Sequence, residues 1–224
     1  MKDIVSSYLE NQMSIDVYAL EEDLKNNLIA DDRELVHLVI DDFVSVAIKY
    51  GSDKNSVGQN QPSESINNIF NQAKFKTDKA YYYCDAIRYA FTHFVDGGLL
   101  QLYEHQQNEC WFPKLVLKDE LKPNDISTLP EMVTIYRGCD ISEYHAREYK
   151  QAWTTNKNVA KQFAYVHYQG QDWFKEAHRV VLMTTISKSD IFYSKQSSEF
   201  EVVINTDKLD IDGIHIFDWY KPVS

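Results

Sequence analysis

The sequence VTIYRGC, residues 133–139, and the sequence SEFEVVIN, residues 198–205, are two short runs rich in strand-forming residues. The first carries Arg137 directly before a glycine, and the second carries Glu199 and Glu201, two residues apart. Because side chains alternate between the two faces of a strand, both glutamates are expected on one face. We expect the two strands to meet in space, which would bring the arginine and the carboxylates together.

A third stretch, AWTTNKNVAKQFAYVHY at residues 152–168, lies between these two runs. Its hydroxyl residues Thr154 and Thr155 end a strand-like segment, and Asn156 is a suitable N-cap for an amphipathic helix that follows. In this order the three stretches resemble the mono-ADP-ribosyltransferases of the arginine, serine, glutamate class. The motifs of that class are an arginine on a strand, a Ser-Thr-Ser segment and a Glu-x-Glu pair. Asn156 departs from the third position of the Ser-Thr-Ser segment, and the resemblance covers residues 130–205.

The resemblance implies that NAD is consumed as a substrate, without a metal, and that its ADP-ribose passes to an acceptor while nicotinamide leaves. Arg137 would hold the pyrophosphate with its rigid fork of donors, and Gly138 would let the ligand approach the backbone. Thr154 would orient the catalytic carboxylate, and Thr155 would take the second hydroxyl position beside the NAD. Glu201 would stabilise the positively charged sugar of the transition state.

The same resemblance assigns the acceptor to Glu199, because arginine-directed members carry Glu at this position and many other members carry Gln. The stretch DIFYSKQSS, residues 190–198, resembles the family's acceptor-recognition loop, where Phe192 or Tyr193 would contact the target. We therefore expect an arginine of a target protein as the acceptor. Two alternatives are transfer to a nucleobase of DNA or RNA, or to water, and a relative that binds NAD or a partner without turnover. A short bacterial or phage-like transferase acting as a toxin or effector would have this size.

The charge of the chain is unevenly distributed. The formal net charge is −11, and residues 1–125 carry 21 acidic against 12 basic side chains, whereas residues 126–224 carry 13 against 11. This distribution disfavours a generic polyanion-binding surface, which needs clustered Lys and Arg. The acidic N-terminal region is either a solvated helical face or a docking surface for a basic partner such as an antitoxin.

The apolar pattern predicts an α+β fold with a helical N-terminal half, residues 1–125, packed on a β-rich ADP-ribosyltransferase core, residues 126–224. Helices are predicted at 15–28, 33–50, 63–75, 78–98, 143–150 and 156–168. Strands are predicted at 132–138, 151–155, 179–187, 199–205 and 213–220. We expect the two halves to be closely joined.

Other chemistries lack their motifs in this sequence. No H-E-x-x-H, phosphate-binding glycine loop or Cys-His zinc pattern occurs, and the histidines have no Ser or Cys nucleophile motif around them. The three cysteines form no C-x-x-C pair, which favours free thiols in a reducing compartment. No apolar run is long enough to cross a bilayer, and no secretion signal is evident, so we expect a cytoplasmic protein.

Overall fold

The computed structural model describes residues 1–51, 61–106, 112–197 and 199–220. The chain divides into two compact units, Met1–Val116 and Leu117–Ser224. The sequence predicts a boundary between residues 125 and 126, and the structure divides the chain between Val116 and Leu117. Close packing of the two halves stays a prediction.

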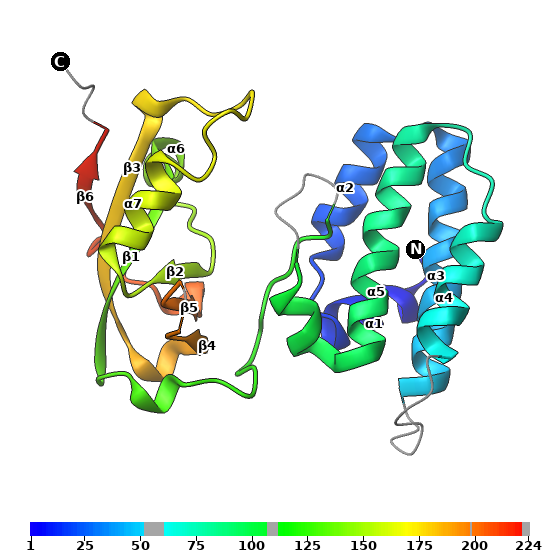
Figure 1. The fold of residues 1–224 in the computed structure, drawn as a ribbon, viewed down its shortest axis with the longest axis horizontal. Helices are drawn as coiled ribbons and strands as arrows, with labels where there is room; N and C mark the ends of the chain where they lie inside the picture. Colours follow the sequence, from blue (N-terminus) through cyan, green and yellow to red (C-terminus); the bar gives the residue numbers. More distant parts are fainter. Residues whose placement is uncertain (52–60, 107–111, 198, 221–224) are drawn as a thin grey trace. The chain divides into compact units, whose positions relative to one another are not determined.

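The first unit is helical (Figure 1). Its helices are α1 (Asp3–Gln12), α2 (Val17–Asn27), α3 (Ala30–Gly51), α4 (Gln61–Gln72) and α5 (Asp78–Glu104). Apolar side chains from all of them form one core, because each helix carries an apolar stripe at helical spacing. Phe43 of α3 contacts Phe91 of α5 at the centre of this core, with ring centroids 5.3 Å apart.

Local signals explain where these helices begin and break. Thr77 caps α5 as expected, since its side chain accepts a hydrogen bond from Ala80 N. Asp16 caps α2 by accepting from Ala19 N, so this helix begins two residues later than predicted. Gly98, with φ 72°, interrupts α5, and the chain resumes a helical course as far as Glu104.

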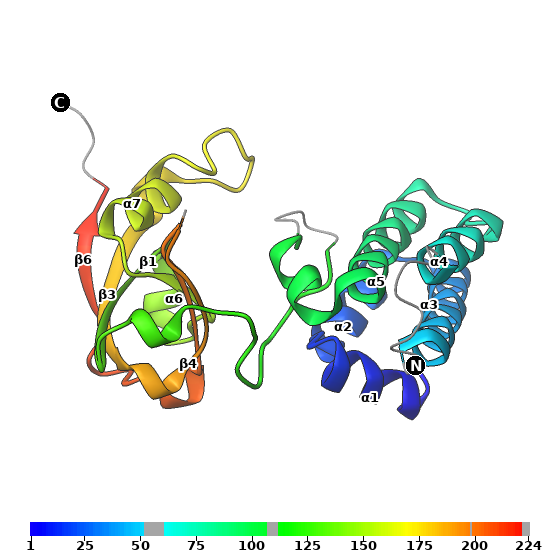
Figure 2. The ribbon, with the colours of Figure 1, turned by 60° about the horizontal axis from the view of Figure 1, so that its bottom comes forward.

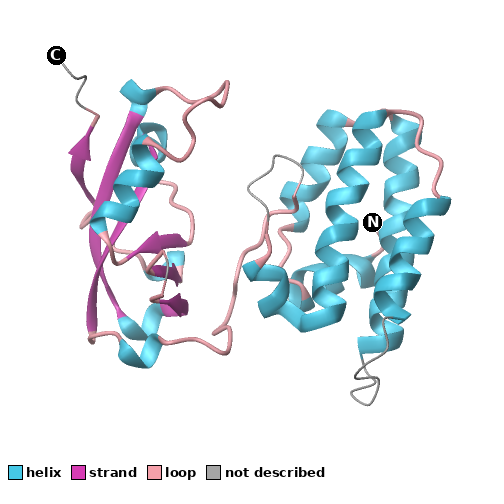
Figure 3. Cartoon of the chain, in the orientation of Figure 1, coloured by secondary structure: helices cyan, strands magenta, loops and turns pink. Residues whose placement is uncertain are grey.

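The second unit is a mixed α and β structure, and Figure 3 shows that the strands gather in it. Its strands are β1 (Met132–Asp140), β2 (Ala152–Thr154), β3 (Arg179–Ser187), β4 (Ile191–Lys195), β5 (Glu201–Ile204) and β6 (His215–Trp219). They form an antiparallel sheet in the order β4-β5-β2-β1-β3-β6. Its helices are α6 (Ile141–Ala146) and α7 (Lys157–Tyr165), and α7 lies against β1 and β3 (Figures 1 and 2). Short 3-10 turns lie at Ile126–Thr128, Glu176–His178, Lys188–Asp190 and Thr206–Lys208.

The predicted α+β class and helical N-terminal half are confirmed, and the second unit contains one strand that is not predicted from the sequence. The resemblance implies a loop at residues 190–198, but Ile191–Lys195 form β4, which pairs with β5. Ile191 and Tyr193 are both buried in this strand, so burial of its apolar side chains accounts for the difference.

Two of the three cysteines lie in the described residues. Cys84 and Cys139 are free and buried, and burial raises the pKa of each thiol to about 12. Both thiols are therefore protonated at neutral pH and pack as small apolar groups. Cys110 lies outside the described residues. No helix in the described ranges is long and apolar enough to cross a membrane.

Candidate functional site

Three adjacent strands carry the three motifs singled out in the sequence. Tyr136, the neighbour of Arg137 on β1, pairs with Thr154 on β2, and Thr154 pairs in turn with Glu201 on β5. Directly paired residues on antiparallel strands project to the same face, so Tyr136, Thr154 and Glu201 share one face of the sheet. Arg137, the next residue on β1, projects to the opposite face, so the structure brings the motif strands together but does not place the arginine side chain on the face of Glu201. Lys195 of β4 is the next partner of Glu201 in the same register.

Arg137 forms a fork-like ion pair within the second unit. Its Nε donates to Glu143 Oε2 at 2.8 Å and its Nη2 to Glu143 Oε1 at 3.0 Å, while Nη1 donates to the carbonyl of Ala152 at 2.6 Å. Burial lowers the pKa of Arg137, but the hydrogen bonds and negative charge of Glu143 raise it by more, so the guanidinium stays charged. These bonds use three of its five N–H donors and leave one on each terminal nitrogen.

Glu143 reaches Arg137 because α6 begins directly after β1. Asp140 caps α6 by accepting from Ser142 N at 2.9 Å, which turns the chain back toward the strand it has just left. The side chains of Arg137 and Glu143 are 13% and 18% exposed. Sequence reasoning missed Glu143, and a pair six residues apart across a strand and a helix has no periodic signal.

Gly138 accommodates a helix in this structure. A Cβ added at Gly138 would lie 2.5 Å from Ala164 N and in still closer contact with the carbonyl oxygen of Ala160. Both atoms belong to the backbone of α7. The packing of α7 already accounts for a glycine at this position, and the approach of a ligand to its backbone stays a prediction.

Thr154 and Thr155 organise the chain around the glutamates. The hydroxyl of Thr154, a residue 5% exposed, donates to the carbonyl of Glu199 at 2.7 Å and accepts from Asn156 N at 3.1 Å. The hydroxyl of Thr155 donates to Gln196 Oε1 at 2.6 Å. In this arrangement the hydroxyl of Thr154 donates to the backbone of Glu199. The resemblance implies instead that this hydroxyl orients the catalytic carboxylate.

Gln196 is a further site residue that the sequence analysis did not identify. Its amide nitrogen Nε2 donates to Ser194 Oγ at 3.1 Å and to the carbonyl of Glu201 at 3.2 Å. Its backbone N–H donates to Asp125 Oδ2 at 2.7 Å. One side chain thus connects Thr155 with the first residue of β5.

The two glutamates differ in backbone environment. Glu201 is the first residue of β5, whereas Glu199 precedes the strand and is exposed. Phe200 between them has φ 52°, in the left-handed region that non-glycine residues rarely adopt. Thr155 N–H donates to the carbonyl of Phe200 at 2.9 Å and holds this turn. The prediction that both carboxylates lie on one strand face is therefore wrong, because the strand begins at Glu201.

A small cavity of about 90 Å³ opens beside Glu199. It is lined by Glu199 and by residues of α7 and the segment after it, namely Val159, Gln162, Phe163 and His167. The neighbouring Tyr168 lies in electrostatic reach of two motif residues. Burial raises the pKa of Tyr168, the charges of Arg137 and Arg179 lower it, and the charge of Glu199 raises it.

The two aromatic residues proposed for acceptor recognition lie on β4. Tyr193 is 2% exposed, so its ring is buried and does not present a surface to an acceptor. Phe192 is half-buried, and its carbonyl accepts a hydrogen bond from Leu121 N. The aromatic side chains that do line the cavity with Glu199 are Phe163 and His167.

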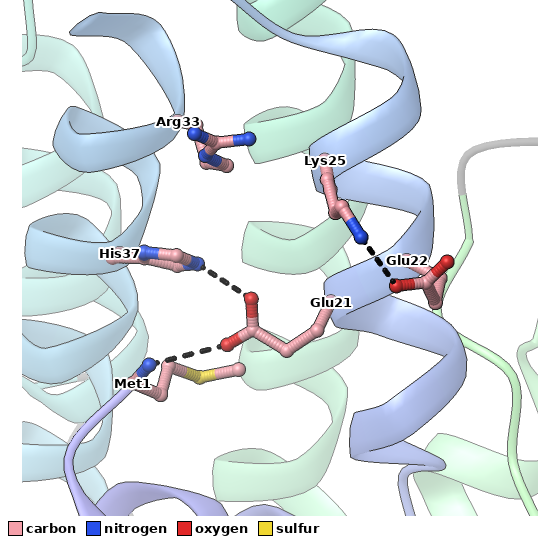
Figure 4. Close-up of a pocket in the computed structure, with 6 residues that line it drawn as sticks. All are labelled: Met1, Glu21, Glu22, Lys25, Arg33 and His37. Atoms are coloured by element: carbon pink, nitrogen blue, oxygen red, sulfur yellow. Dashed lines mark hydrogen bonds and ion pairs between the residues drawn. The ribbon is translucent and has the colours of Figure 1, made fainter. Parts of the chain in front are cut away.

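A larger cavity, of about 350 Å³, belongs to the helical unit (Figure 4). Its lining residues are Met1, Glu21, Glu22, Lys25, Arg33 and His37. The carboxylate of Glu21 bridges the Met1 nitrogen at 3.2 Å and His37 Nε2 at 3.0 Å, and Lys25 pairs with Glu22 at 3.3 Å. Most of the charges in this cavity therefore neutralise one another, and it contains none of the motif residues.

In comparisons with known proteins, no family model, curated protein or solved structure matches the chain. Over the ranges that the structure describes, no group of three or more His, Cys, Asp and Glu side chains is arranged to hold a metal ion.

Proposed function

We propose that this protein transfers ADP-ribose from NAD to an acceptor, an arginine of a target protein, and releases nicotinamide. The observation that carries the proposal is the register of Tyr136 with Thr154 and of Thr154 with Glu201. It sets the three motif stretches on adjacent strands of one sheet, although 64 positions separate Arg137 from Glu201 in the sequence.

The proposed reaction breaks the bond between the nicotinamide nitrogen and C1 of the ribose. Nicotinamide leaves as a neutral molecule with the electron pair of that bond, and the ribose gains the character of an oxocarbenium ion. The carboxylate of Glu201 stabilises this cation. A guanidino nitrogen of the acceptor then forms the new bond to C1, and its proton passes to the carboxylate of Glu199.

Arg137 is the proposed pyrophosphate ligand. Its bonds to Glu143 and Ala152 fix the guanidinium, and the two remaining terminal N–H groups supply a bidentate donor pair. Fixing the guanidinium in advance lowers the entropy lost when the dinucleotide binds.

The activity is tested by incubating the purified full chain with NAD labelled in its adenylate part and a cell lysate. Nicotinamide release reports cleavage of NAD, and labelling of macromolecules reports transfer. Digestion of the labelled material with protease in one sample and with nucleases in another identifies the acceptor class. Release of nicotinamide with label lost only to protease is the expected result, and the absence of nicotinamide release would overturn the proposal.

Arg137→Lys is expected to weaken NAD binding by roughly 10- to 100-fold, because lysine keeps the charge but loses the planar pair of donors. The affinity is measured by titration calorimetry. Arg147→Lys is the matched control, since Arg147 is an exposed arginine of the same unit that pairs with Asp212. Equal NAD affinity in the wild type and in folded Arg137→Lys would show that Arg137 serves only its ion pair with Glu143.

Glu199→Gln is expected to lower transfer to arginine at least about tenfold more than it lowers nicotinamide release. The change removes the base that accepts the guanidino proton and leaves the Glu201 carboxylate in place. Both activities are measured on one preparation, with Glu148→Gln, at an exposed glutamate, as the control. Equal loss of the two activities contradicts separate roles for the glutamates, and labelling that survives the change favours a nucleobase acceptor.

A further inference from the structure

The cavity beside Glu199 has a wall that is fixed at several points. Its aromatic side chains come from α7 and the residues just after it, and Gly138 allows this helix to lie directly on β1. At the C-terminal end of α7, the buried Arg179 donates from Nε to the carbonyl of Ala164 at 3.0 Å and from Nη2 to that of Phe163 at 3.4 Å. The opposite side is the turn at Phe200, which Thr154 and Thr155 hold by hydrogen bonds.

We propose that this cavity is the acceptor subsite and that it takes the guanidinium group of an arginine side chain. The inference rests on the proposed function and adds to it Gln162, Phe163 and His167 as residues that determine acceptor specificity. A carboxylate beside aromatic rings attracts a planar cation, because the ring faces carry negative charge and the guanidinium stacks on them. None of the five lining residues is a lysine or arginine that would repel it.

The lining of the cavity favours an arginine over a nucleobase. A guanidinium group has four non-hydrogen atoms and a purine more than twice as many, so the smaller cation is the better match to a cavity of about 90 Å³. The five lining residues offer no cation for the phosphate that accompanies a nucleobase.

A row of aromatic side chains, half-buried at Phe163 and Tyr168 and exposed at Trp173, continues from the cavity along the segment after α7. The ring of Phe163 lies 6.4 Å from that of Tyr168, whose ring lies 5.2 Å from that of Trp173. Trp173 is 57% exposed, which is unusual for a large aromatic side chain. This row offers apolar contact to the part of a protein acceptor that flanks the modified arginine, since Trp and Tyr are favoured in binding surfaces.

The test changes the charge of the cavity at Gln162, which is exposed on α7 and lines the cavity. Agmatine, a small guanidino compound, is the probe. Gln162→Lys is expected to raise the KM for agmatine about tenfold by repulsion, and Gln162→Glu is expected to lower it by attraction. Gln162→Lys should lower the ratio of agmatine labelling to nicotinamide release, and Gln162→Glu should raise this ratio. Gln171→Lys introduces the same charge at an exposed position outside the cavity lining and serves as the control.

A second measurement keeps the subsite separable from NAD chemistry. Agmatine binding to the wild type and the three variants is followed by saturation-transfer NMR in the absence of NAD, with circular dichroism as the check of folding. Weaker agmatine binding to Gln162→Lys and tighter binding to Gln162→Glu support the subsite. If these shifts occur and no nicotinamide is released, the subsite is supported and the proposed function is overturned. Nicotinamide release with agmatine parameters that are equal in all variants, or with labelling of nucleic acid alone, overturns the subsite and leaves the transferase proposal standing. The subsite is also overturned if the wild type neither binds agmatine nor labels it.

Discussion

Glu201→Gln is expected to lower nicotinamide release by roughly 10²–10³-fold, which corresponds to about 2.7–4 kcal/mol of transition-state stabilisation. Glutamine has nearly the same shape as glutamate but lacks the negative charge that would stabilise the ribose cation. Glu201 is half-buried at the start of β5, paired with Thr154 of β2 on one side and Lys195 of β4 on the other, so its charge lies on the sheet face that these two residues share. Release of nicotinamide and transfer to the acceptor should fall together, because both follow cleavage of the same bond.

The control for this change is Glu131→Gln, which removes an exposed carboxylate that pairs with Lys188 just before β1. Circular dichroism and thermal unfolding show whether each variant keeps its fold. A folded Glu201→Gln protein that releases nicotinamide at the wild-type rate would remove the basis for assigning catalysis to Glu201. A loss of transfer alone would instead move Glu201 from cleavage of NAD to recognition of the acceptor.

The parts of the fold that the sequence predicted depend on short-range patterns. Val39 and Phe43 lie four residues apart on the apolar stripe of α3, and both are buried. Thr77 occupies the position that its residue type favours, before the first turn of α5. Asn156 likewise caps α7 by accepting from Asn158 N at 2.9 Å. Such signals are carried by a few neighbouring residues and do not require knowledge of the tertiary structure.

The strand β4 was missed although its residues carry a strand pattern. Ile191 and Tyr193 alternate with the less buried Phe192, and this period of two is typical of a half-buried strand. The resemblance to a family segment predicts a loop here instead. The local physical signal was the better guide at this position.

The geometry of the candidate site depends on contacts between segments that are distant in the sequence. The left-handed conformation of Phe200 is held by Thr154 and Thr155, more than forty positions earlier. A phenylalanine gives no sign of a positive φ, because residues that favour this region are glycine and asparagine. Nothing in the sequence indicates the role of Gln196, because this role comes from contacts with Thr155, Asp125 and Glu201 of β5, which are distant or not periodic in the sequence. These features become visible only when the strands have been paired.

Gly138→Ala is expected to reduce the free energy of unfolding by at least about 2–3 kcal/mol. The added methyl group would meet the backbone of α7 at Ala160 and Ala164, and backbone atoms cannot turn aside as the end of a flexible side chain can. The helix would have to move away from β1, which would open the apolar contact of Ala160 and Ala164 with Val181. The change is measured by urea denaturation of the full chain, together with hydrogen exchange of the amides of α7.

Gly213→Ala is the matched control, because a Cβ at Gly213 would meet Asp210 Oδ2 at 2.7 Å, the end of a side chain that can rotate. We expect this control to change the unfolding free energy by less than about 1 kcal/mol. If Gly138→Ala is equally well tolerated, α7 does not lie on β1 as closely as described. If the variant folds with a displaced α7, the cavity between α7 and Glu199 changes shape, and the KM for agmatine should rise more than the KM for NAD. The same substitution therefore tests whether the contact between α7 and β1 sets the geometry of the acceptor subsite.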